Sequence, residues 1–218
     1  MELNSNLPIN DPMTVATDYL IALFCLFFGY RLYLRYKAGG QKSILLWSLA
    51  FSFTAVASLM GGSYHGINAM IPDTALIILW KMTIYSIGLA GLTMLAGTVV
   101  ATFVDPVRIL FLIFLTAKFL AYGAWMANHN LFLYVIVDYG SGMLLLLLLQ
   151  IYSYYRRHDQ DVKWLIGGVL VSFLAVAAQQ SGIRLHEYFN HNDLYHIIQL
   201  AGLSLFYKGA SQFVDAGG

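Results

Sequence analysis

Residues 43–72 read SILLWSLAFSFTAVASLMGGSYHGINAMIP, thirty positions without an Asp, Glu, Lys or Arg. The hydrocarbon core of a bilayer is ~30 Å thick and is crossed by about 20 apolar residues of helix. This stretch between Lys42 and Asp73 is therefore long enough for one membrane-spanning helix and the start of a connection.

Three more uncharged stretches of similar length follow, at residues 82–104, 119–137 and 164–183. Shorter apolar runs lie at both ends of the chain, and turn-forming residues such as Gly39-Gly40 and Asp105-Pro106 separate the runs. The pattern predicts an all-α integral membrane protein, a single seven-helix transmembrane domain over residues 1–218. The expected helices are 19–36, 43–64, 74–103, 107–126, 131–154, 162–183 and 194–208.

The composition agrees with a membrane protein. Hydrophobic residues make up 59% of the chain and charged residues 11%, and the mean hydropathy is +0.68, which excludes an ordinary soluble domain. The formal net charge is +1 without a basic cluster, so nucleic acid is not an expected partner. Cys25 is the single cysteine, which excludes an intrachain disulfide. The expected partners are the lipid bilayer, a membrane lipid and, in a homo-oligomer, further copies of the chain.

Positive charge predicts the orientation in the membrane, because Lys and Arg in short loops stay on the cytoplasmic side. These residues flank the first, third and fifth connections and the C-terminus: Arg31, Arg35, Lys37, Lys42, Arg108, Arg156, Arg157, Lys163 and Lys208. Arg184 is an exception. We therefore expect a multi-pass protein of a cell or inner membrane with its N-terminus outside and its C-terminus in the cytoplasm. The first twelve residues lack a basic region, so we do not expect a cleaved signal peptide.

Five of the six histidines fall on the outer side in this topology: His65, His129, His186, His191 and His196. The sixth, His158, lies in a basic cytoplasmic loop, where solvation explains it. Ionisable groups at membrane depth are costly and often functional. The outer side is therefore the predicted place of the functional site.

The end of the second helix carries polar residues at helical spacing. Ser58 precedes His65 by seven positions, nearly two turns, so their side chains share a face with Gly61. Ser63 lies close to His65 in sequence. Asp73 begins the third helix, where a carboxylate could cap the helix, orient a histidine or hold a water molecule.

The second outer cluster surrounds the start of the last helix, with His191 and His196 five residues apart. On a continuous helix this spacing separates two side chains by about 140°. If Asn192 or Asp193 caps the helix, His191 lies outside it and can turn toward His196. Together with His65, three imidazoles would then converge. Three protein ligands plus a water molecule are typical of catalytic zinc, which lowers the pKa of that water to about 7.

The seven helices, the Ser and His near the end of helix two, the Asp of helix three and the His pair of helix seven resemble the CREST superfamily of membrane hydrolases. This superfamily includes the alkaline ceramidases and the adiponectin and progestin receptors. The resemblance implies a zinc ion held by three His, with a Ser and an Asp placing the water, and hydrolysis of a lipid amide such as ceramide. It implies a distant branch of that group.

Two positions depart from the family pattern. The family spaces Ser and His as S-x-x-x-H, and Gly61 stands in the Ser position here, so Ser58 and Ser63 are both candidates. The family pair in helix seven is H-x-x-x-H, and Asn192 stands in its first position. His186, Asn192 and Asp193 therefore remain alternatives to His191 as the ligand. Within the hydrolase hypothesis, Asp73 is the general base or water-orienting residue, and Ser58 or Ser63 stabilises the oxyanion.

A third polar group is expected near the middle of the membrane. By helical rise, Lys81, Lys118 and Asp138 reach similar depths, so Lys118 or Lys81 can pair with Asp138, and Gln179 approaches the same level. Such a group either fixes helix packing or binds substrate. The alternative to a hydrolase is therefore a non-enzymatic transporter or a receptor for lipid or pH that uses Lys81, Lys118 and Asp138.

Overall fold

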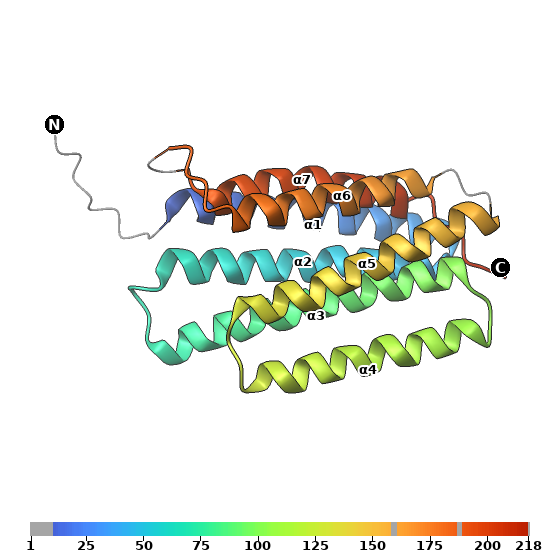
Figure 1. Ribbon diagram of the computed structural model, residues 1–218, viewed down its shortest axis with the longest axis horizontal. Coiled ribbons are helices and arrows are strands. Elements are labelled where there is room, and N and C mark those ends of the chain that lie inside the picture. The colour runs from blue at the N-terminus through green and yellow to red at the C-terminus, as the bar shows by residue number, and fades with distance from the viewer. Residues whose placement is uncertain (1–10, 158–160, 187–188, 218) are drawn as a thin grey trace.

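Seven α-helices form within residues 11–157, 161–186 and 189–217, the part of the chain that the computed structural model describes (Figure 1). Their bounds are α1 Pro12–Gly39, α2 Lys42–Ile67, α3 Asp73–Thr102, α4 Val107–Ala127, α5 Phe132–Arg157, α6 Val162–Gln180 and α7 His191–Ala210. No strand is found in these residues, and the expected all-α class is confirmed. His158 lies outside the described residues.

Six of the described helices, α1 to α6, are long and apolar enough to cross a membrane. α7 has 20 residues, but its first turns are polar. The chain therefore has the length and composition of a multi-pass membrane protein. Helices α2 to α7 begin and end within three residues of the predicted limits, whereas α1 begins at Pro12, seven residues before the predicted start.

The starts of α1 and α7 both depart from the sequence prediction. Pro12 occupies the first turn of α1, where its missing N–H costs no hydrogen bond. The predicted cap of α7 at Asn192 or Asp193 is wrong, because Asn190 caps the helix. The Asn190 side chain accepts from the Asn192 N–H at 2.8 Å, and the Asp193 carboxylate accepts from the Asn190 N–H at 2.8 Å. This capping box makes His191 the first residue of α7.

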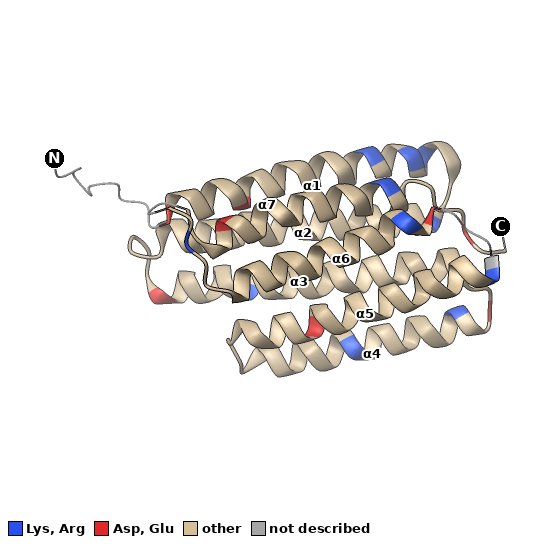
Figure 2. Ribbon diagram, turned by 45° about the horizontal axis from the view of Figure 1, so that its top comes forward, with Lys and Arg blue, Asp and Glu red and all other residues tan. Residues whose placement is uncertain are grey.

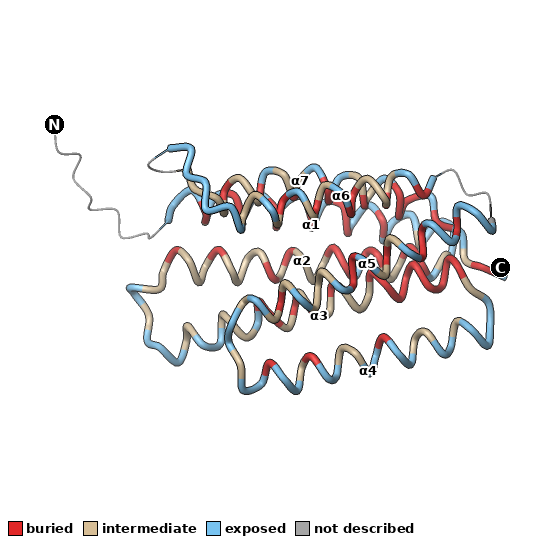
Figure 3. The backbone as a smooth tube through the Cα atoms, in the orientation of Figure 1, coloured by how far each residue is buried: buried red, intermediate tan, exposed pale blue. Residues whose placement is uncertain are grey.

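Six helices surround a central space, and α4 lies outside them. In the order α1, α2, α3, α5, α6 and α7, each helix packs on the next, and α7 packs back on α1. α4 packs on α3 at the edge of the bundle (Figure 1), and most of its surface is exposed or half-buried (Figure 3). We call the end at which α1, α3, α5 and α7 begin the N-terminal end. Most Lys and Arg lie at the opposite end, near the C-terminus (Figure 2).

Polar contacts attach α4 to its neighbours. The expected ion pair between Lys118 of α4 and Asp138 of α5 is confirmed, and the Lys118 ammonium also donates to the Asp138 carbonyl at 3.1 Å. Lys81, the alternative partner, donates instead to carbonyls at and after the end of α4, those of Met126, Ala127 and His129. Both lysines therefore hold α4 against α3 and α5.

The C-terminal segment after α7 binds the start of α2. The Asp215 carboxylate accepts from the backbone N–H groups of Lys42 at 2.7 Å and Ser43 at 2.9 Å, and from the Ser43 hydroxyl at 2.5 Å. The next residue, Ala216, donates its N–H to the Val100 carbonyl at 3.0 Å. Asp215 thus satisfies N–H groups that a helix start cannot satisfy internally, and it ties the last helix to α2.

Candidate functional site

A cavity of about 390 Å³ lies inside the ring of six helices. This volume is typical of a site for a small molecule or a lipid chain. Every helix of the ring contributes to its wall, and α4 does not. Much of the wall is apolar, with Ile87, Val135, Met143 and Val176 among its members. Its polar members include Asp18, Ser58, His65, Gln179, Asn192, His196 and Gln199, together with Thr54, Thr83, Ser172, Tyr139 and Tyr195.

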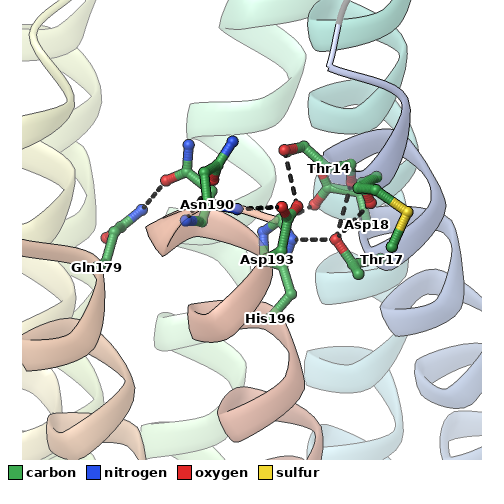
Figure 4. A network of polar contacts seen from close by, with 9 residues as sticks. Thr14, Thr17, Asp18, Gln179, Asn190, Asp193 and His196 are labelled. Carbon is green, nitrogen blue, oxygen red and sulfur yellow. Dashed lines mark hydrogen bonds and ion pairs between the residues drawn. The ribbon is translucent and has the colours of Figure 1, made fainter. Parts of the chain in front are cut away.

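The centre of the polar wall is a contact between α1 and α7, the Asp18–His196 pair (Figure 4). His196 Nε2 lies 3.3 Å from Asp18 Oδ1, and both residues are 7% exposed. The other ring nitrogen of His196, Nδ1, lies 2.8 Å from the Thr17 hydroxyl. A buried carboxylate and a buried imidazole thus face each other at the edge of an apolar cavity.

The Thr17 hydroxyl determines which imidazole nitrogen carries the hydrogen. Two backbone carbonyls of its own helix also lie within reach of this hydroxyl, Met13 at 3.0 Å and Thr14 at 3.1 Å. When the hydroxyl hydrogen goes to one of these carbonyls, Thr17 accepts from the N–H at Nδ1 of His196, and the Nε2 lone pair then faces Asp18. Two acceptor atoms at this distance require a proton or a cation between them. The arrangement is also that of a metal-binding histidine, whose second nitrogen donates to an orienting partner.

A second buried carboxylate, that of Asp193, lies near the Asp18–His196 pair and joins α7 to α1. Asp193 is fully buried, and it accepts from the Thr14 hydroxyl at 2.9 Å as well as from the Asn190 backbone. Thr14, Thr17 and Asp18 share one face of α1, because they lie at positions i, i+3 and i+4. Two hydrogen bonds from this face, at Asp193 and His196, fix the first turns of α7 against α1 (Figure 4).

A glycine of α2 allows α1 to come close at this level. A Cβ placed on Gly62 would lie 2.9 Å from the Cβ of Asp18 and 3.0 Å from the Tyr19 ring, nearer than real side chains approach. The adjacent Gly61 lines the cavity, and a Cβ there would meet Thr83 at an ordinary 3.5 Å. Gly62 therefore sets the position of Asp18 relative to the α2 wall.

The structure brings some of the predicted site residues together at this cavity. His65, Ser58 and Gln179 lie on its wall with His196. The Gln179 amide donates to the Asn192 side chain at 3.3 Å, so the residue in the family's first His position faces the same space.

Other predicted residues lie elsewhere. His191 is the first residue of α7, so the five-residue spacing turns it away from His196, and the described cavity wall does not include it. The expectation that His191 turns toward His196 is therefore wrong. Asp73 is exposed at the start of α3, and Ser63 bonds to the Tyr19 hydroxyl at 3.0 Å and to the Leu59 carbonyl. Lys81, Lys118 and Asp138, which attach α4 to its neighbours, do not line the cavity.

His129 and His186, two more of the histidines predicted to lie on the outer side, have local contacts. His129 stacks on Trp125 with ring centroids 4.0 Å apart, and its Nδ1 lies 2.7 Å from the Trp125 carbonyl. His186 is exposed and forms a backbone bridge with Phe189. Neither His129 nor His186 lines the cavity.

The sequence prediction missed Asp18, Thr14 and Thr17, because it began the first helix after them. Their spacing was the available signal: a carboxylate and two hydroxyls on one face at the start of an apolar run indicate a buried polar contact.

The donor set for a metal consists of Asp18, His65 and His196, the charged and imidazole groups of the cavity wall. Two of them already face each other at 3.3 Å, with His196 held by Thr17. Within residues 11–157, 161–186 and 189–217, no three His, Cys, Asp or Glu side chains are gathered closely enough to form a metal site as they stand.

Comparison with protein families gives one match. A family model described as a family of unknown function, DUF6962, matches residues 13–215, from the first turn of α1 to the segment that binds α2. Comparison with curated proteins and with solved structures gives no match.

Proposed function

The chain belongs to the family of unknown function DUF6962, and we propose that it is a membrane-embedded hydrolase that cleaves a lipid amide or ester. The observation that carries the proposal is the Asp18–His196 pair at the wall of an apolar cavity inside membrane-length helices. The resemblance to the CREST superfamily points to the same class of reaction, although a shared fold does not by itself establish function.

The cavity supports a lipid as the substrate. Much of its wall is apolar, and five of the six helices around it, α1, α2, α3, α5 and α6, are long and apolar enough to cross the bilayer. An acyl chain buried there gains about 0.8 kcal/mol for each CH₂ group removed from water. Polar groups at the N-terminal end of the bundle then meet the amide or ester group of the lipid.

We propose that zinc binds Asp18, His65 and His196, the donor set described above. Two imidazoles and a carboxylate are a ligand set of known catalytic zinc sites. When bound, zinc supplies an activated water molecule at neutral pH. This assignment replaces His191 of the sequence prediction with Asp18.

The chain's own residues then have separate roles. Thr17 accepts the Nδ1–H of His196 and keeps Nε2 directed at the metal-binding side. Asp193 and Thr14 hold the first turns of α7 in register with α1. Ser58, the predicted serine that lines the cavity, donates to the substrate carbonyl as negative charge develops on its oxygen. In the overall reaction, water adds OH to the acyl carbon and H to the departing amine or alcohol.

The orientation follows from the charges. Most Lys and Arg lie at the C-terminal end of the bundle (Figure 2), and positive residues favour the cytoplasmic side. We therefore place the Asp18–His196 pair on the extracytoplasmic side.

The contacts of Lys81, Lys118 and Asp138 favour a structural role over substrate binding. Each of the lysines bonds to groups of α3, α4 or α5 outside the main cavity. A receptor or transporter that uses these residues is therefore the weaker candidate. A receptor that binds lipid in the cavity without cleaving it is separated from the hydrolase by the following experiment.

The test compares the lipids of cells that express the wild type, Asp18→Asn or Asp73→Asn. Asp73→Asn is the matched control, because Asp73 is exposed at the same end of the bundle but lies away from the cavity. We expect one lipid amide or ester to accumulate with Asp18→Asn and not with Asp73→Asn, and purified wild type to cleave it. If no lipid differs between the wild type and Asp18→Asn, the chain is not a lipid hydrolase.

A further inference from the structure

Below the Asp18–His196 pair, the cavity wall contains a second polar group, formed by Gln199 of α7 and Ser172 of α6. Both residues line the cavity, and they are 7% and 3% exposed. The Gln199 amide nitrogen lies 3.4 Å from the Ser172 hydroxyl oxygen. This distance is long for a hydrogen bond, because the usual donor–acceptor distance is at most about 3.2 Å.

The two groups retain unused hydrogen-bonding capacity. An amide side chain has two N–H donors and a carbonyl acceptor, and a serine hydroxyl has a hydrogen and two lone pairs. In the described part of the chain, the one hydrogen bond of this amide is its long contact to Ser172. Burying such groups without partners is costly. A polar group of a ligand would therefore be stabilised at this point.

Two threonine hydroxyls of the cavity wall differ from this pair. Thr54 and Thr83 donate to backbone carbonyls of their own helices, Ala50 and Leu79, at 2.9 Å each. Threonine in a helix commonly satisfies itself in this way, and it then presents mainly its methyl group. Gln199 has no such local partner among the described contacts, since its bond runs to another helix.

The position of Gln199 on α7 sets the distance from the cleavage site. Gln199 follows His196 by three residues, so the two side chains lie on the same face of α7, and both line the cavity. Three residues of α-helix rise about 4.5 Å, which corresponds to about three or four bonds of an extended alkyl chain. α7 begins at the N-terminal end, so Gln199 lies deeper in the bundle than His196.

We propose that Gln199 and Ser172 form a specificity subsite for a hydroxyl group on the acyl chain of the substrate, about three to five carbons from the acyl carbon. The inference rests on the proposed function, because it places the acyl carbon at the Asp18–His196 pair. A hydroxyl is the group that fits, since it can donate to the amide oxygen and accept from the amide N–H or the serine. The apolar wall beyond it, with Ile87, Val135 and Met143, takes the rest of the chain.

The test measures binding of the acids that hydrolysis would release. The purified chain of residues 1–218 is titrated with hexadecanoic, 5-hydroxyhexadecanoic and 16-hydroxyhexadecanoic acid. We expect the wild type to bind the 5-hydroxy acid about three- to tenfold more tightly than the plain acid, as one buried hydrogen bond allows. The 16-hydroxy acid should bind no more tightly than the plain acid.

Variants assign the preference to the subsite. Gln199→Leu should lose the preference while it still binds the plain acid, and Ser172→Ala should reduce it. Ser172→Ala is also the second variant if Gln199→Leu does not fold. Ser204→Ala is the control, because Ser204 is exposed on the same helix and donates to the Leu200 carbonyl.

The outcomes separate the subsite from the proposed function. Equal binding of the plain and 5-hydroxy acids by the wild type overturns the subsite but not the proposal that the cavity binds a lipid chain. A preference that persists in both Gln199→Leu and Ser172→Ala also overturns it, as does tighter binding of the 16-hydroxy acid. Failure of all three acids to bind overturns the subsite and the lipid cavity together.

Discussion

Two regions of the bundle hold charged groups between apolar helices, and they use them differently. At the attachment of α4, Lys118 and Asp138 neutralise each other, and Lys81 donates to carbonyl groups at the end of a helix. At the N-terminal end, the one ion-pair partner of Asp18 among the described residues is the imidazole of His196, with Nε2 3.3 Å from Oδ1. The first region contains its own neutralising charge, whereas in the second a proton or a metal ion can lie between the two groups. This difference separates a structural contact from a candidate reaction centre.

The largest expected effect comes from removing one carboxylate from each region. Asp18→Asn should lower hydrolysis of the accumulating lipid at least about 100-fold, because a charged donor to the metal is lost. Asp138→Asn should leave the rate within about threefold when equal amounts of folded protein are compared. Initial rates with purified, reconstituted protein measure both. Comparable rate losses in the two variants would remove the distinction between the regions.

Thr17 is expected to orient the His196 imidazole. Thr17→Val should lower the rate about tenfold or more, because His196 loses the acceptor that directs its Nε2. Thr17→Ser keeps the hydroxyl and should restore most of the rate. Thr17→Ser is the control, because it changes the side-chain volume but keeps the hydroxyl. A comparison of the two rates therefore separates orientation of the imidazole from packing of α1. Equal activity of the Val and Ser variants would contradict an orienting role.

The close approach of α1 and α2 should be sensitive to one methyl group. Gly62→Ala places a Cβ 2.9 Å from the Asp18 Cβ, and we expect a loss of about 1–2 kcal/mol in the free energy of unfolding, as for other overpacked sites. The Cβ added by Gly61→Ala lies 3.5 Å from Thr83, and this variant should change the free energy of unfolding by less than about 0.5 kcal/mol. Unfolding of the two variants in detergent is the measurement. A more stable Gly62→Ala variant would show that α1 does not approach α2 in this way.

The smallest expected effect is on stability, at the Lys118–Asp138 pair that attaches α4, and a double substitution tests whether this pair is purely structural. Lys118→Met should destabilise the protein by about 1 kcal/mol, because it leaves the Asp138 carboxylate without its partner; both side chains are partly exposed, which reduces the cost. Adding Asp138→Leu should recover most of the loss, since an apolar pair replaces the ion pair. Additive losses in the double variant would contradict a purely structural pair.

Much of the fold follows from charge spacing, and the departures have local causes. Uncharged stretches predict α2, α3 and α6, because bilayer thickness fixes the length of a span, whereas the stretch 119–137 crosses the connection between α4 and α5. They fail at α1, where Thr14, Thr17 and Asp18 continue the helix because they find partners on α7. Apolar length therefore underestimates a helix whose polar turn is satisfied by a distant element.

The site could be predicted in part. His65, His196 and Ser58 could be recognised from their spacing and from the side of the membrane that the positive charges predict for them, and the Lys118–Asp138 pair from its predicted depth. The role of His191 depended on which residue caps α7. Asn190, Asn192 and Asp193 are all suitable caps by residue type, and the contact between Asp193 and Thr14, 179 residues away, accompanies the Asn190 cap. Long-range contacts of this kind are not visible in local sequence.

The most direct test of the central claim is the zinc content of purified protein after reconstitution with the metal. About one zinc per chain is predicted for the wild type and for Asp73→Asn, and a loss of most of it for Asp18→Asn, His65→Ala and His196→Ala. A folded wild type that binds no zinc, or full zinc content in all three cavity variants, would contradict a metal site built on the Asp18–His196 pair.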